Sequence, residues 1–162
     1  PGSVGPMDES PHGTMDPTTA TELIESWLGE HVEANPALRS IEREPKEQRW
    51  IVRLEGEEKD IVAVWFTLGQ RTIRVESQVT PAPEEDHAAV YEYVLRRNDR
   101  AFGWCWSIGE EDALYVRGRF SLLTLDHEEL DRILGSVYAE VEQSFRPILR
   151  VGFATRLARS KA

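Results

Sequence analysis

The sequence predicts an α+β domain, an antiparallel sheet of five to six strands packed by three helices. Two observations support this. Apolar residues recur at helical spacing in three segments of the chain. Between these segments lie short runs in which apolar and polar residues alternate or apolar residues are continuous, as in strands. The expected order is helix, three or four strands, helix, two strands, helix.

The first helix is expected to begin at Thr19, because residues 19–22 have the Ser/Thr-x-x-Glu form of a capping box. It should end near Asn35 and Pro36. Its apolar stripe comprises Leu23, Ile24, Trp27, Leu28, His31 and Val32. His31 falls on this stripe, so we expect it at a boundary or an interface.

Two strands are expected to follow, with a turn at residues 45–47 between Ile41 and the alternating residues 50–54. A second turn covers residues 55–60. Residues 61–68 are almost continuously apolar, which predicts a central strand covered on both faces. Gly69 and Gln70 suit a two-residue type II′ hairpin. In the next strand, Ile73, Val75, Ser77 and Val79 should share one face.

Pro83 fits the first position of the second helix, and the acidic residues 84–86 would complement the positive end of its dipole. Arg96, Arg97 and Asn98 should close that helix. An aromatic hairpin follows, turning at residues 109–112. One face of this hairpin should hold Trp104, Trp106 and Ile108, with Leu114, Val116 and Phe120 in its second strand.

The last helix should begin with a side-chain cap at Asp126. Its apolar stripe comprises Leu130, Ile133, Leu134, Val137, Val141, Phe145 and Ile148 or Leu149. Pro147 should end or kink the helix, because proline lacks the backbone donor that a helix interior requires.

The expected boundaries are an N-terminal segment over 1–16, which resembles a tag remnant and should be disordered, one domain over 17–149, and a basic tail over 150–162. The formal charge is −10, yet five basic and no acidic residues follow position 145. Because an acidic body repels phosphate, we do not expect a nucleic acid partner. The chain has no apolar run long enough to cross a membrane, and no secretion signal. Its single cysteine cannot form an intramolecular disulfide, so we expect a cytoplasmic protein.

No catalytic, cofactor or metal site is predicted. Cys105 has no sequence signature that supplies a base, so we interpret it as a packed thiol. His87 and His127 lie in acidic first turns of helices without the i, i+4 pairing of a helical zinc site. The carboxylates at 55–60 and 110–112 lack the ordering of a calcium loop and fit solvated turns.

Residues 91–145 resemble the YbjN family, whose members share the fold of type III secretion chaperones. The resemblance rests on apolar spacings around one polar residue, Asn98. The apolar residues that carry this spacing are Val94, Leu95, Trp106, Ile108, Leu114, Val116, Leu130, Val137 and Val141. It extends in order and length over residues 20–146.

The resemblance implies a non-enzymatic and commonly dimeric protein that presents a surface to another polypeptide. An apolar sheet face that three helices leave uncovered would need such a partner, so we predict a homodimer or an unidentified protein or peptide partner. The candidate surface comprises Trp65, Phe66, Arg74, Trp104, Trp106 and Arg117. The alternative is a small-ligand regulatory domain, with a pocket between sheet and helices where Arg53, Arg74 and Arg117 orient an anion.

Overall fold

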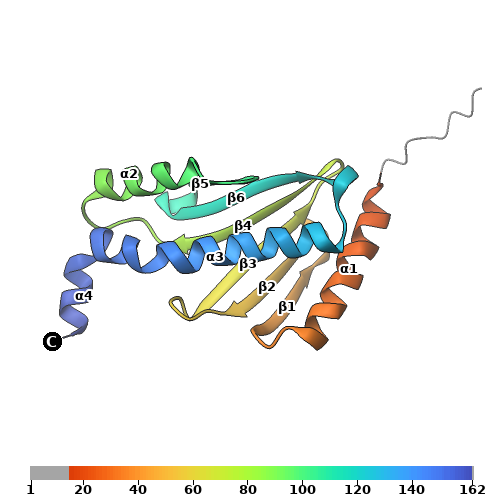
Figure 1. Ribbon diagram of the computed structural model, residues 1–162, viewed down its shortest axis with the longest axis horizontal. Coiled ribbons are helices and arrows are strands. Elements are labelled where there is room, and N and C mark those ends of the chain that lie inside the picture. The colour runs from red at the N-terminus through yellow and green to blue at the C-terminus, as the bar shows by residue number, and fades with distance from the viewer. Residues whose placement is uncertain (1–14, 162) are drawn as a thin grey trace, which may run out of the picture.

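The structure, a computed structural model, describes residues 15–161. Six antiparallel strands form one sheet in the order β1-β2-β3-β4-β6-β5. The long helix α3 crosses the front of this sheet, with α1 near one end and α2 beside β5 and β6 (Figure 1). The helices are α1 (Pro17–Ala34), α2 (His87–Asn98), α3 (His127–Gly152) and α4 (Ala154–Ser160). The strands are β1 (Leu38–Glu44), β2 (Arg49–Glu55), β3 (Ile61–Leu68), β4 (Thr72–Thr80), β5 (Trp104–Ile108) and β6 (Leu114–Ser121). This architecture confirms the predicted fold class.

Helix α3 supplies the centre of the core. The predicted stripe is buried from Leu130 to Val141, and Ile148 continues it, whereas Phe145 is only partly buried. The stripe packs against one face of the sheet, which buries Val62, Val64, Phe66, Ile73 and Val75 completely. Each such side chain contributes about 1.5–3 kcal/mol relative to an exposed one.

Helix α1 is capped three residues earlier than the capping box predicts. Asp16 is the N-cap, since its carboxylate accepts the Thr19 backbone N–H at 2.7 Å, and Pro17 occupies the first helical position. Aspartate followed by proline is a strong start signal. Met15 packs against the core. The remainder of the expected N-terminal segment, residues 1–14, lies outside the described residues.

The strands alternate as predicted, but β3 is covered on one face only. Val62, Val64, Phe66 and Leu68 are buried beneath the helices, while Ile61 and Trp65 on the other face are exposed. The expectation of cover on both faces is therefore wrong for the single chain. The type II′ turn is also wrong, because Gly69 does not have the positive φ that this turn requires.

The acidic segment before α2 does not start that helix. The backbone N–H groups of Glu84 and Glu85 donate to the Gly152 carbonyl, which holds residues 83–86 against the end of α3. Helix α2 begins only at His87. The Glu85 carboxylate accepts the Thr155 backbone N–H at 2.7 Å, so it caps the N-terminus of α4 instead of α2.

Pro147 does not end α3, which continues to Gly152. Ile148 is buried just beyond the proline, and this packing retains the helix where one backbone hydrogen bond is lost. The basic tail expected over 150–162 forms the end of α3 and helix α4, as far as residue 161. Phe153 between these helices is buried.

A buried carboxylate joins α2, α3 and β5. Glu140 on α3 accepts hydrogen bonds from Nε and Nη2 along one edge of the Arg97 guanidinium, from Trp106 Nε1 at 2.9 Å and from Ser144 Oγ at 3.0 Å. Glu140 raises the pKa of Arg97 through these hydrogen bonds. Beside it, Asn98 Oδ1 accepts the Trp106 backbone N–H at 2.6 Å. The polar residue that carried the family resemblance therefore pairs with the edge of β5.

We expect Glu140→Ala to lower the free energy of unfolding by about 3 kcal/mol, because it removes the carboxylate that pairs with the partly buried Arg97 guanidinium and leaves the buried Trp106 indole N–H without its acceptor. Urea denaturation measures this loss. The matched control is Glu92→Ala, which removes an exposed i, i+4 partner of Arg96 and should cost less than about 0.5 kcal/mol. Equal losses in the two variants would contradict the assigned role.

Candidate partner-binding face

The side of the sheet that faces away from α3 is here called the open face. One row of cross-strand neighbours runs over all six strands of this face. In order from β1 to β5, this row comprises Glu42, Ile51, Trp65, Glu76, Arg117 and Cys105. The face therefore combines aromatic, aliphatic and charged side chains.

The six predicted surface residues divide between the two faces. Trp65, Arg74 and Arg117 lie on the open face, with Trp65 37% exposed. Phe66 and Trp106 are buried in the core, so their placement on a surface is wrong for the single chain. Trp104 shares the helix-side face with Trp106, where it is partly buried against the core.

Arginine side chains cover much of the open face. The guanidinium of Arg49 lies 5.0 Å from the centre of the Trp65 ring, and that of Arg117 lies 4.0 Å from the Tyr115 ring. Ile51 points to this face yet is buried. The open face is thus less apolar than the sequence of β3 alone predicts, because its neighbouring strands contribute charged residues.

A cavity of about 370 Å³ opens beside Trp65. The register between β4 and β6 shifts between Gln78 and Thr80, and both residues line the cavity. The rest of the lining includes Ala63, Tyr115 and Phe145. Such a mixed lining suits an amphipathic side chain of a partner.

Lys59 stands at the rim of this cavity. Its ammonium donates to the Gln78 carbonyl at 2.8 Å and lies 6.0 Å from the Phe145 ring centre. Burial lowers the pKa of Lys59, although the nearby Glu142 carboxylate opposes this shift. Glu142 also accepts the backbone N–H groups of residues 57–59, which fastens the β2–β3 loop to α3.

Two arginines of the open face pair with Glu76. Arg74 Nε lies 2.9 Å from one oxygen of this carboxylate, and Arg117 Nε lies 3.5 Å from the other. Arg53, the third arginine of the alternative prediction, instead pairs with Glu42 at 2.9 Å. All three arginines lie on the side of the sheet away from the helices, so a pocket between sheet and helices that contains them is wrong.

The thiol of Cys105 is exposed on the edge strand β5, so its interpretation as a packed thiol is wrong. His87 is exposed beside the edge of the Tyr91 ring. Nδ1 of His127 lies 3.1 Å from a carboxylate oxygen of Glu30. Within residues 15–161, no three His, Cys, Asp or Glu side chains lie close enough together to hold a metal ion.

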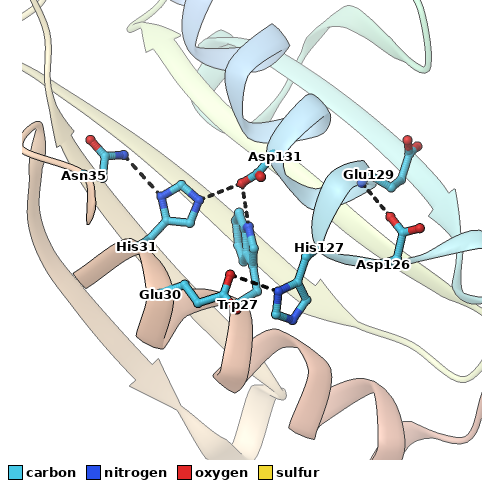
Figure 2. A network of polar contacts seen from close by, with 8 residues as sticks. All are labelled: Trp27, Glu30, His31, Asn35, Asp126, His127, Glu129 and Asp131. Carbon is cyan, nitrogen blue, oxygen red and sulfur yellow. Dashed lines mark hydrogen bonds and ion pairs between the residues drawn. The ribbon is translucent and has the colours of Figure 1, made fainter. Parts of the chain in front are cut away.

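A polar junction fastens α1 to α3, as Figure 2 shows. One oxygen of Asp131 accepts the Trp27 Nε1–H at 2.8 Å and lies 2.8 Å from His31 Nε2. Asn35 contacts the other ring nitrogen of His31. The hydrogen bonds from Trp27 and His31 lower the pKa of Asp131. His31 thus lies at the contact between α1 and α3.

The chain belongs to the YbjN family, whose model matches residues 21–150 and is described as "putative bacterial sensory transduction regulator". The uncharacterized proteins ML2442 of Mycobacterium leprae and Rv0487 of Mycobacterium tuberculosis are each 34% identical to it over 109 residues, or 67% of the chain. The chain spans only about 60% of the length of these relatives.

Two solved structures share the fold. The crystal structure of the ExsC–ExsE complex matches with a TM-score of 0.55 and 16% identity, covering 80% of this chain and 92% of the matched chain. The heterodimeric ExoU–SpcU complex from the type III secretion system of Pseudomonas aeruginosa matches with a TM-score of 0.52 and 14% identity, covering 77% and 96%. The expected type III secretion chaperone-like fold is therefore confirmed.

Sequence reasoning missed three residues of the open face: Glu76, Tyr115 and Arg119. A signal for them was present, because Tyr115, Arg117 and Arg119 alternate with the apolar residues of β6 and must share a face. Only the pairing of β6 with β4, however, brings Arg117 opposite Glu76.

No helix of the described residues is long and apolar enough to cross a membrane.

We expect the stability that Asp131 contributes to depend on pH. Its pKa is lowered from 3.8 in the folded chain, so the contribution is complete above the unfolded pKa and is lost as pH falls through the folded value. Asp131→Asn should therefore be less stable than the parent protein at pH 7, and the difference should shrink as pH falls below the unfolded pKa of 3.8.

Urea denaturation at several pH values tests this, with Asp99→Asn as the control for the same change at an exposed position. A difference between parent and Asp131→Asn that stays constant from pH 7 to pH 3 would contradict the role of the carboxylate.

Proposed function

We propose that the chain is a non-enzymatic module that binds a protein or peptide on the open face, in a chaperone-like or regulatory role, and that it acts as a homodimer. The observation that carries the proposal is the unequal cover of the sheet. Helices bury one face, while the other presents Trp65 and a cavity beside it. On the sequence grounds given above, we place this role in the cytoplasm.

The composition of the open face suits a reversible protein contact. Tryptophan, tyrosine and arginine are the residue types that most often dominate binding energy, and Trp65, Tyr115 and Arg117 meet on this face. A face that combines these residues with glutamate is too polar for the core of an obligate interface. Its composition is typical of an interface that forms and dissociates reversibly.

The edge of β5 favours binding across the face over addition of a strand at that edge. The Oδ1 atom of Asn98 accepts the Trp106 backbone N–H, and its Nδ2 lies 3.5 Å from the Trp106 carbonyl oxygen. A peptide strand could pair there only by displacing Asn98. An extended segment that crosses the open face would instead place one side chain beside Trp65.

The small-ligand alternative needs a different location from the expected one. Apolar side chains fill the space between sheet and helices, and Arg53, Arg74 and Arg117 lie beyond the sheet. A ligand that uses these arginines would bind on the open face.

We expect Trp65→Glu to abolish partner binding, because it places a charge where the partner buries an aromatic surface. The measurement uses a polypeptide that copurifies stoichiometrically and is then purified and titrated by calorimetry. A loss of at least a hundredfold in affinity supports the proposal, with the circular dichroism spectrum unchanged. The control is Leu123→Glu, an equally charged change at an exposed leucine outside the sheet face, which should bind like the parent. Full binding by Trp65→Glu would place the partner elsewhere.

We expect light scattering at tens of micromolar to give a mass of about twice 18.5 kDa. The physical reason is the number of large apolar side chains that the single chain leaves exposed away from the open face, among them Phe102 and Leu95. A mass of 18.5 kDa would contradict the homodimer while leaving the binding proposal intact.

A further inference from the structure

We propose that Arg74, Arg117 and Arg119 form a binding site for an oxyanion that carries two negative charges, either one phosphate group or a pair of neighbouring carboxylates. These side chains line a cavity of about 520 Å³ over β4, β5 and β6. Ser107, Cys105 and Trp104 contribute to the same lining. This inference does not depend on the polypeptide partner proposed above.

The first argument is the concentration of positive charge. The chain as a whole has a formal charge of −10, yet three arginines meet in this cavity. Arg74 on β4 is the direct cross-strand neighbour of Arg119 on β6. Like charges in directly opposed positions destabilise a sheet, so the pair lowers the stability of the empty protein. A bound anion would remove this repulsion.

The second argument is that one carboxylate organises the arginines without neutralising them. Glu76 contacts the Nε atoms of Arg74 and Arg117, which leaves the outer nitrogens of Arg74 and the Nη2 of Arg117 for a ligand. Arg119 is exposed and makes no ion pair with any residue from 15 to 161. Three arginines and one glutamate leave a net charge of +2, which matches a dianion.

The third argument is that the position of the Arg117 side chain lowers the stability of the folded protein. Its Nε is buried and lies 3.5 Å from a Glu76 carboxylate oxygen, a contact that pairs the two charges without forming a hydrogen bond, so the Nε–H has no hydrogen-bond partner among the described residues. Its guanidinium nevertheless stays over the Tyr115 ring, with Nη1 3.4 Å from Ser107 Oγ. A buried donor without a partner is destabilising, and such a donor commonly accompanies a functional site. The arrangement presents a fixed fork to a ligand.

The geometry selects the chemistry of the ligand. Guanidinium groups bind phosphate and carboxylate oxygens through paired hydrogen bonds, which a halide or a neutral molecule cannot satisfy. The anionic oxygens could belong to a free small molecule or to neighbouring acidic side chains of a polypeptide. Both sources present the same oxygens to the arginines, and the experiment separates them.

The test is calorimetric titration of the full chain at low ionic strength with three probes. They are inorganic phosphate, citrate, and an amidated peptide of alternating glutamate and alanine, with the corresponding glutamine peptide as its blank. The variants are Arg119→Gln and Arg74→Gln. The matched control is Arg53→Gln, which removes the same charge from the same face but outside this cavity.

We expect at least one anionic probe to bind and added salt to weaken it. Arg119→Gln and Arg74→Gln should each weaken binding about tenfold or more, while Arg53→Gln changes it less than twofold. Binding of phosphate or citrate alone assigns the site to a free ligand, and binding of the acidic peptide alone assigns it to a polypeptide. Failure of every probe to bind the parent protein, or equal binding by parent, Arg119→Gln and Arg74→Gln, would overturn the inference.

A second measurement does not require a ligand. Because Arg119 is exposed and opposes Arg74, Arg119→Gln should unfold at a temperature no lower than the parent in low salt. Addition of the binding anion should raise the unfolding temperature of the parent and leave that of Arg119→Gln almost unchanged. A clear drop in the unfolding temperature of unliganded Arg119→Gln would show that the arginine stabilises the empty sheet, contrary to the proposal.

Discussion

The packing of α3 on one face of the sheet is the constraint on which the remaining structure depends. One helix with a continuous apolar stripe can cover one face of the sheet. Every second residue of the strands points to this face and is buried against the helix. Because of the same alternation, the other side chains of the strands point to the opposite face, which none of the described helices covers. The open face is thus a direct result of how the core is closed.

Three glutamates on or near α3 show how the chain holds distant segments to this core. Glu140 joins α2 and β5, Glu142 fastens the β2–β3 loop, and Glu85 caps α4. In each case a carboxylate accepts N–H groups from a segment far away in the chain. An acidic protein of this kind uses its negative charge partly as internal hydrogen-bond acceptors, so net charge alone overstates how acidic its surface is.

The open face presents two different environments side by side. Around Trp65 it is aromatic and partly apolar, and around Arg119 it is strongly positive within an acidic protein. Glu76 lies between them, since it neighbours Trp65 on one strand and Arg117 on another. A segment lying across the face would meet both environments, whereas a small anion would occupy only the second.

The sequence alone determined the element order, the buried stripe of α3, the alternation of β4 and the end of α2 at Asn98, because periodicity and helix ends are local properties. It could not decide that residues 83–86 stay outside α2, that α3 continues past Pro147, or that Phe66 is buried while Trp65 is exposed. These outcomes depend on contacts with segments distant in the chain, such as the Gly152 carbonyl for residues 84 and 85. The arginine cavity belongs to the same class. Alternation placed Arg117 and Arg119 on one face, but only the pairing of β4 with β6 set Arg74 against Arg119 and Glu76 against Arg117, because strand register is a tertiary property.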